Sequence, residues 1–84
     1  MYQVIIKRPA EKELDTLPEN VRRRIVARLL MLEENPRPSG FKKLRGEEAF
    51  RLRVGDYRVL YTIDDRARIV TIYAVGHRRE VYRR

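Results

Sequence analysis

The sequence of 84 residues contains no cysteine, which excludes disulfide bonds, thiolate metal sites and cysteine nucleophiles. With a single histidine as well, it leaves no credible cluster of metal ligands. It has no glycine-rich phosphate loop, no apolar run long enough to cross a membrane and no signal peptide at its start. We therefore expect a single cytoplasmic domain, residues 1–84, that uses no metal ion or other cofactor.

Positive charge is what the sequence has in excess. It holds 20 Lys and Arg against 12 Asp and Glu, a net charge of +8, of which +7 lies from Arg37 onward. Such an asymmetry favours a polyanionic partner, because contacts to phosphate release counterions. A solvated, arginine-rich surface is the alternative that charge alone leaves open.

The pattern of the chain predicts a strand, two helices and then a sheet. Residues 2–6 are β-rich. Pro9 begins a short helix, and Pro18 separates it from a long amphipathic helix that ends at Glu34. Three β-rich runs follow, at residues 49–54, 57–63 and 68–77. We expect an α+β fold in which a helical hairpin covers one face of a sheet made of the N-terminal strand and a three-stranded antiparallel meander.

The long helix carries two apolar strips. The first is formed by residues at helical spacing: Val21, Ile25, Leu29 and Leu32. Val26 and Leu30 form the second, about 100° around the helix. We expect the second strip to pack against the first helix, with a partner helix as the alternative.

Gly55-Asp56 predicts a two-residue hairpin turn of type II′, and this turn sets the strand register. It places Arg53 opposite Arg58. Side chains that oppose each other share a sheet face, so one face carries Arg51, Arg53, Arg58, Leu60 and Thr62. We call it the arginine face. The other face is apolar and must lie under the helices.

The second turn, taken as residues 64–67, extends this assignment to the last strand. Tyr73 is then expected opposite Arg58. Thr71, Val75 and His77 would join the arginine face, whereas Val70, Ile72 and Ala74 would join the apolar face.

Arginines placed directly across a sheet repel each other, so the Arg53–Arg58 pair with nearby Arg51 needs a counter-anion. We interpret the cluster as a site for phosphate or carboxylate. Neutralisation by solvent or by the chain's own acidic side chains is the alternative. Close to the end of the sequence, His77 is a candidate proton donor or acceptor because its ordinary pKa lies near neutrality. Tyr82 is a candidate to stack on a base, and for both residues a structural role stays open.

The order and spacing of four segments resemble the RelE/ParE superfamily of toxin–antitoxin modules. These segments are Leu44-Arg45-Gly46, residues 50–54, residues 55–61 and residues 75–82. Resemblance to the RelE branch implies the RelE-like microbial ribonuclease fold. It also implies a toxin that enters the ribosomal A site and cuts mRNA, where the 2′-hydroxyl attacks the adjacent phosphate without a metal ion.

The same resemblance implies an active site formed by Arg51, Arg53, Arg58, Arg78 and Tyr82. RelE has lysines at the positions of Arg51 and Arg53, and arginine does not give up its proton. Only the phosphate-binding role therefore transfers to these two residues, and His77 becomes the candidate acid or base, with Glu80 second. Further RNA contacts are expected from Lys42, Lys43, Arg45, Tyr73, Arg79 and Arg83.

The expected partners are the ribosome with its mRNA and a cognate acidic antitoxin that folds over the basic sheet or the helical hairpin. Operator DNA is expected to bind only through the antitoxin complex, and no membrane partner is expected. The alternative is a family member that does not cut RNA. Such a member would be a ParE-like gyrase inhibitor, or an inactive protein that binds only its antitoxin and operator DNA.

Overall fold

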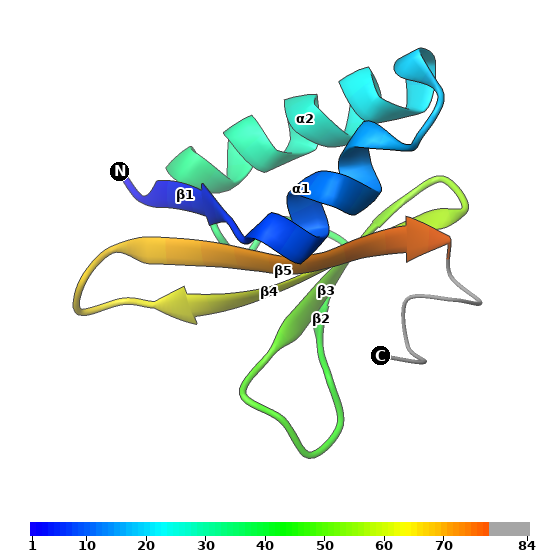
Figure 1. Cartoon of the computed structure of the whole chain (residues 1–84). Coiled ribbons are helices and arrows are strands. Elements are labelled where there is room, and N and C mark those ends of the chain that lie inside the picture. Colours follow the sequence, from blue (N-terminus) through cyan, green and yellow to red (C-terminus); the bar gives the residue numbers. More distant parts are fainter. Residues whose placement is uncertain (78–84) are drawn as a thin grey trace.

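Two helices lie across one face of a five-stranded sheet (Figure 1). The computed structural model describes residues 1–77. Its elements are β1 (Gln3–Ile6), α1 (Arg8–Asp15), α2 (Glu19–Glu34), β2 (Phe41–Lys43), β3 (Phe50–Val54), β4 (Tyr57–Asp64) and β5 (Ile69–His77). The predicted α+β class and element order are confirmed, and β2 is an additional strand that the sequence pattern did not indicate. Neither described helix is long and apolar enough to cross a membrane.

The sheet is mixed, with the strand order β1-β5-β4-β3-β2. β1 pairs in parallel with β5, and all other neighbours are antiparallel. The predicted meander is therefore present as β3-β4-β5, and β2 extends it at one edge. The ring of Phe41 explains why so short a strand joins, because it lies 5.7 Å from the ring of Phe50 on the helix-covered face.

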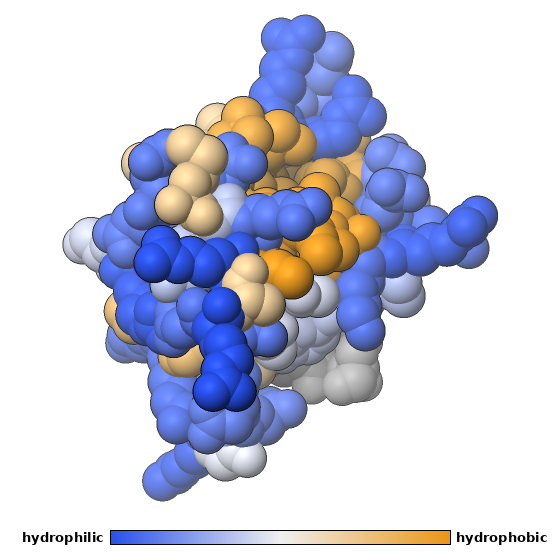
Figure 2. All heavy atoms as spheres, turned by 90° about the vertical axis from the view of Figure 1, so that its left-hand side faces the viewer, coloured by the Kyte–Doolittle hydropathy of each residue, from blue (hydrophilic) through white to orange (hydrophobic). Residues whose placement is uncertain are grey.

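The core lies between the helices and the apolar face of the sheet. Ile25, Leu29 and Leu32 of α2 are buried, as the first apolar strip predicts. Val26 and Leu30 are 37% and 58% exposed, so the expected packing of the second strip is wrong. The reason is that α1 buries Ala10 and Leu14 in the core and packs along β5 instead. Figure 2 shows hydrophobic side chains gathered in one area of a mostly hydrophilic face.

The β3–β4 hairpin has the predicted register at all five pairs, from Val54 opposite Tyr57 to Phe50 opposite Tyr61. At the turn, Gly55 has a φ of 61°. Positive φ at the first turn residue is the requirement that favours glycine in a type II′ turn. The Gly55-Asp56 pair therefore fixes which β3 and β4 side chains share a face.

The predicted register between β4 and β5 is wrong throughout. In the first half it is shifted by two residues, so Val70, Thr71 and Ile72 keep their predicted faces. The turn occupies residues 65–68, and Asp64 pairs with Ile69. A β-bulge then inserts one extra residue in β5, because Tyr61 pairs with Ile72 but Leu60 pairs with Ala74. One extra residue reverses the faces of everything that follows.

Past the bulge, Val75 is therefore in the core under the helices and His77 lies on that same side, opposite Tyr57. Ala74 moves to the arginine face, and Gly76 rather than Tyr73 lies opposite Arg58. The backbone N–H of Val75 donates to Glu13 Oε1 of α1 at 3.2 Å, which stabilises the bulged segment from outside the sheet.

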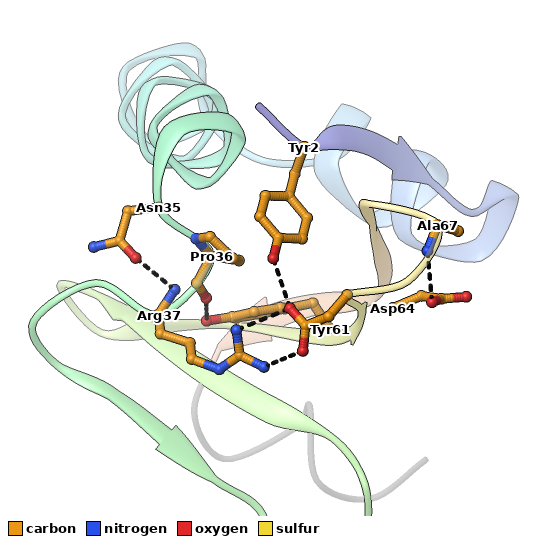
Figure 3. Close-up of polar contacts among 8 residues, drawn as sticks. Tyr2, Asn35, Pro36, Arg37, Tyr61, Asp64 and Ala67 are labelled. Carbon is orange, nitrogen blue, oxygen red and sulfur yellow. Dashed lines mark hydrogen bonds and ion pairs between the residues drawn. The ribbon is translucent and has the colours of Figure 1, made fainter.

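A polar cluster joins three distant segments at the end of the sheet near the N-terminus (Figure 3). The Tyr2 hydroxyl donates to Asp65 Oδ1 at 2.6 Å, and the Arg37 guanidinium donates to both carboxylate oxygens of Asp65 at 3.1 and 2.8 Å. These hydrogen bonds, from Arg37 first and Tyr2 second, lower the pKa of Asp65 to about 2. The cluster fastens the β4–β5 turn to β1 and to the loop that follows α2.

Candidate nucleic-acid interface

The sheet face that the helices leave bare is the arginine face. Arg53 lies directly opposite Arg58, and Arg51 opposite Leu60, as predicted. The added strand β2 brings Lys42 opposite Arg51, so a fourth cation shares this face. Three neighbouring strands thus place their cationic side chains on one surface, and the sheet rather than any loop sets their spacing.

Arg58 is buried, with only 7% of its surface exposed. Its Nη1 donates a long hydrogen bond of 3.4 Å to the carbonyl of Tyr57. Its Nε is buried and has no hydrogen-bond partner among residues 1–77. Burying a guanidinium without a carboxylate is costly, and a bound anion would supply the missing acceptor.

The ion pairs of the described residues lie elsewhere. They join Arg23 to Glu19, Arg37 to Asp65 and Lys43 to Glu48. Within residues 1–77, none of them involves Lys42, Arg51, Arg53 or Arg58. The chain's own described carboxylates therefore do not neutralise the cationic side chains of the arginine face.

A small apolar cluster lies beside these cations on the same face. Leu60 and Ala74 are buried there, and Leu44 and Tyr73 pack against them. Tyr73 thus reaches the arginine face, as predicted, although it is not opposite Arg58. An aromatic ring next to several cations is an arrangement that suits a nucleotide, whose base stacks while its phosphate pairs with the cations.

Three predicted residues lie away from this surface. His77 is on the helix side, where its ring meets the Tyr57 ring edge-on at 5.8 Å, so its predicted place on the arginine face is wrong because of the bulge. Lys43 shares the helix-covered face with Phe50, its cross-strand partner. Arg45 is exposed in the loop between β2 and β3.

The predicted site residues Arg78, Arg79, Tyr82 and Arg83, and also Glu80, lie outside the described residues. Among residues 1–77, no group of three or more His, Cys, Asp or Glu side chains is arranged to hold a metal ion.

An open groove of about 640 Å³ adjoins the arginine face at the β2–β3 edge. It includes Arg28 of α2, a residue that the sequence analysis did not single out. Arg28 is distant from β3 in sequence, and only the docking of α2 on the sheet brings it to this edge, so no local pattern could have identified it.

The helical layer, the mixed sheet and the basic open face are those of the small toxins of type II toxin–antitoxin systems. The sequence model of the family described as ParE toxin of type II toxin-antitoxin system, parDE, matches residues 4–82. Toxin RelG of Mycobacterium tuberculosis is 38% identical over 86 residues, covering 99% of this chain and 98% of that protein.

Solved structures agree with this relation. The toxin–antitoxin complex RelBE2 of Mycobacterium tuberculosis matches with a TM-score of 0.82 and 35% identity, covering 92% of this chain and 98% of the matched chain. The archaeal RelE–RelB complex of Pyrococcus horikoshii matches with a TM-score of 0.83 and 30% identity, covering 94% and 97%. The chain belongs to the RelE/ParE family, and its relatives named here place it with the RelE toxins.

Proposed function

We propose that the protein is a ribosome-dependent mRNA endoribonuclease. The observation that carries the proposal is the buried guanidinium of Arg58, which has no carboxylate partner among the described residues and lies beside Arg53 and Arg51. A phosphodiester placed on the arginine face would satisfy these groups together. Kinship with RelE toxins supports the same activity.

The proposed reaction is attack by a ribose 2′-oxygen on the adjacent phosphorus. A new P–O bond forms to the 2′-oxygen, the P–O bond to the 5′-oxygen breaks, and the products are a 2′,3′-cyclic phosphate and a 5′-hydroxyl. The 2′-hydroxyl proton leaves to water, and the 5′-oxygen takes one from water. Guanidinium groups lower the barrier because the phosphate gains negative charge in the transition state.

Each residue of the proposed site has a limited task. Arg51, Arg53 and Arg58 hold the phosphate as permanent cations, since arginine keeps its proton. Arg78 would add a phosphate contact, and Tyr82 would stack a nucleotide. We assign no step to His77, because its side chain lies on the helix side of the sheet.

The test is incubation of the purified protein with ribosomes programmed with a defined mRNA, followed by mapping of the RNA ends. We expect cleavage in the A site and little or none of the same mRNA free in solution. The matching family model, described as a ParE toxin, makes gyrase inhibition the second candidate, and a supercoiling assay run beside the first tests it. Intact mRNA on programmed ribosomes, together with inhibited supercoiling, would reverse the assignment.

We further propose an acidic antitoxin as the partner, and operator DNA as a ligand of that complex only. Relatives were crystallised as RelBE and RelE–RelB complexes, and the net charge of +8 favours an acidic segment. If this segment covers the arginine face, its affinity should fall steeply with added salt. An affinity insensitive to salt would instead place it on the exposed strip of Val26 and Leu30.

A further inference from the structure

We infer that RNA binding extends beyond the arginine face, around the β2–β3 edge of the sheet and onto α2, where Arg28 binds a second phosphate of the RNA backbone. This inference rests on the proposed function for the identity of the ligand. The location of the site comes from the structure alone. Neither the residues that carry the family resemblance nor those of the arginine face include a residue of α2.

The site is the groove of about 640 Å³ at the β2–β3 edge. Its walls come from α2, from the loop before β2, from β2 and β3, and from the β3–β4 turn. The lining residues are Arg28, Ser39, Gly40, Lys42, Arg51, Arg53, Gly55 and Asp56. Arg51 and Arg53 belong to both the groove and the arginine face, so the two surfaces are continuous.

Charge in the groove has one dominant sign. Four of the lining side chains are cationic, and Asp56 is the one carboxylate among those that line it. The ion pairs of residues 1–77 leave Arg28, Lys42, Arg51 and Arg53 without an acidic partner. A groove with low-dielectric walls and charges of one sign concentrates the field and attracts the opposite charge.

The β3–β4 turn allows α2 to approach this edge. A Cβ atom at Gly55 would lie 3.4 Å from Nη2 of Arg24, so the guanidinium of Arg24 packs closely over the glycine. Arg28 follows Arg24 by one helical turn and therefore lies on the same side of α2. Glycine at position 55 thus serves the turn and also the close contact between turn and helix.

The ligand is an extended polyanion rather than a single phosphate. Arg58 does not line the groove, whereas its neighbours Arg51 and Arg53 do. A backbone whose reacting phosphate lies at Arg58 therefore has its next phosphates along the groove toward Arg28. A phosphodiester chain fits better than an acidic peptide, because the groove offers several cations and no large apolar residue among those that line it.

The RNA has two possible sources, the mRNA strand itself and ribosomal RNA near the A site. Two binding arms separate them. The first measures the affinity for a short single-stranded RNA with 2′-O-methyl groups, which cannot be cleaved. The second measures the affinity for ribosomes that carry no mRNA. Both arms are repeated over a series of salt concentrations.

The variant is Arg28→Gln, and its control is Arg23→Gln on the same helix, where Arg23 is exposed and pairs with Glu19 at 3.1 Å. The salt slope is the slope of the logarithm of the binding constant against the logarithm of the salt concentration. Loss of one phosphate contact should reduce its magnitude for single-stranded RNA by about 0.7 and weaken binding about fivefold at 0.1 M salt. Arg23→Gln should leave both quantities unchanged. Asp56→Asn should have the opposite effect and tighten binding.

Because Arg28 is half-buried, Arg28→Gln could weaken binding by disturbing the packing of α2. Arg28→Lys controls for this effect, since it keeps the positive charge and should therefore keep the salt slope of the wild type. If Arg28→Gln reduces the salt slope for single-stranded RNA, the groove binds mRNA. If it reduces the slope only for ribosomes without mRNA, the groove binds ribosomal RNA. If Arg28→Gln matches Arg23→Gln in both arms, the inference is wrong. It is equally wrong if only binding of an acidic peptide such as polyglutamate weakens.

The outcome is separable from that of the proposed function. If the wild-type protein cleaves mRNA and Arg28→Gln has no effect on RNA binding, the role of the groove is wrong and the proposed nuclease activity stands. If the salt slope of RNA binding depends on Arg28 but no mRNA is cleaved, the role of the groove stands and the proposed nuclease activity is wrong.

Discussion

Replacing Arg58 by leucine should lower the single-turnover rate of mRNA cleavage on programmed ribosomes by about 10²–10³-fold. Losing one preorganised donor to a developing anion costs this much in comparable sites. Arg58 is the buried arginine of the arginine face, with 7% exposure and an Nε that has no hydrogen-bond partner among residues 1–77. Its field at a bound phosphate is therefore less screened by water than that of exposed Arg53.

The stability of the Arg58→Leu variant should stay equal to that of the wild type or rise. A leucine fills part of the space beside Leu60. The variant also no longer carries a buried charge opposite Arg53 that lacks an acidic partner among the described residues. Chemical denaturation checks this point, and Arg66→Leu in the exposed β4–β5 turn is the matched control for loss of one arginine. Wild-type cleavage by Arg58→Leu would remove Arg58 from the mechanism, and a large loss of stability would make any loss of activity uninformative.

Replacing Tyr61 by phenylalanine should change how stability depends on pH. Tyr61 is fully buried, and its hydroxyl donates to the carbonyl of Pro36 at 2.9 Å (Figure 3). Burial raises the pKa of Tyr61 to about 12, against a smaller lowering effect of the Arg37 charge. The folded state therefore favours the neutral phenol, whereas the unfolded chain ionises near pH 10.

It follows that the contribution of the neutral Tyr61 to stability is fully present below pH 10, and that about 3 kcal/mol of it is lost as the pH rises through about 12. Tyr61→Phe lacks this ionisation. Below pH 10 it should be less stable by about 1–2 kcal/mol, because the Pro36 carbonyl loses its donor. Between pH 10 and 12 the difference should shrink and pass through zero, because the wild type loses more than this advantage. Urea unfolding in both pH ranges measures this difference in the free energy of unfolding. If the free energies of the two proteins changed in parallel with pH, the burial argument would be wrong.

Much of the fold was predictable because local chemistry determines it. Alternating apolar residues gave the sheet its two faces, and proline positions gave the helix boundaries. The Gly55-Asp56 turn then fixed the β3–β4 register, with glycine at a φ of 61°. Since the register alone decides which side chains share a face, the common face of Arg51, Arg53 and Arg58 was predictable from the sequence.

The rest depends on contacts between distant segments. The three-residue strand β2 exists because Phe41 packs on Phe50, and no three-residue pattern predicts that. The bulge in β5 depends on tertiary support, which includes the hydrogen bond from the Val75 N–H to Glu13, and it moves His77 to the other side of the sheet. Arg28 joins the groove only through the docking of α2.

The parallel pairing of β1 with β5 has a consequence for the making of the protein. The first strand of the described chain finds its neighbour only in the last one. During synthesis, β1 and both helices are made well before β5 exists, so the sheet cannot close around its core early. The arginine face, which needs β4 held between β3 and β5, is therefore assembled last. A newly made chain therefore acquires its complete cationic surface only after β5 has been synthesised and has left the ribosome.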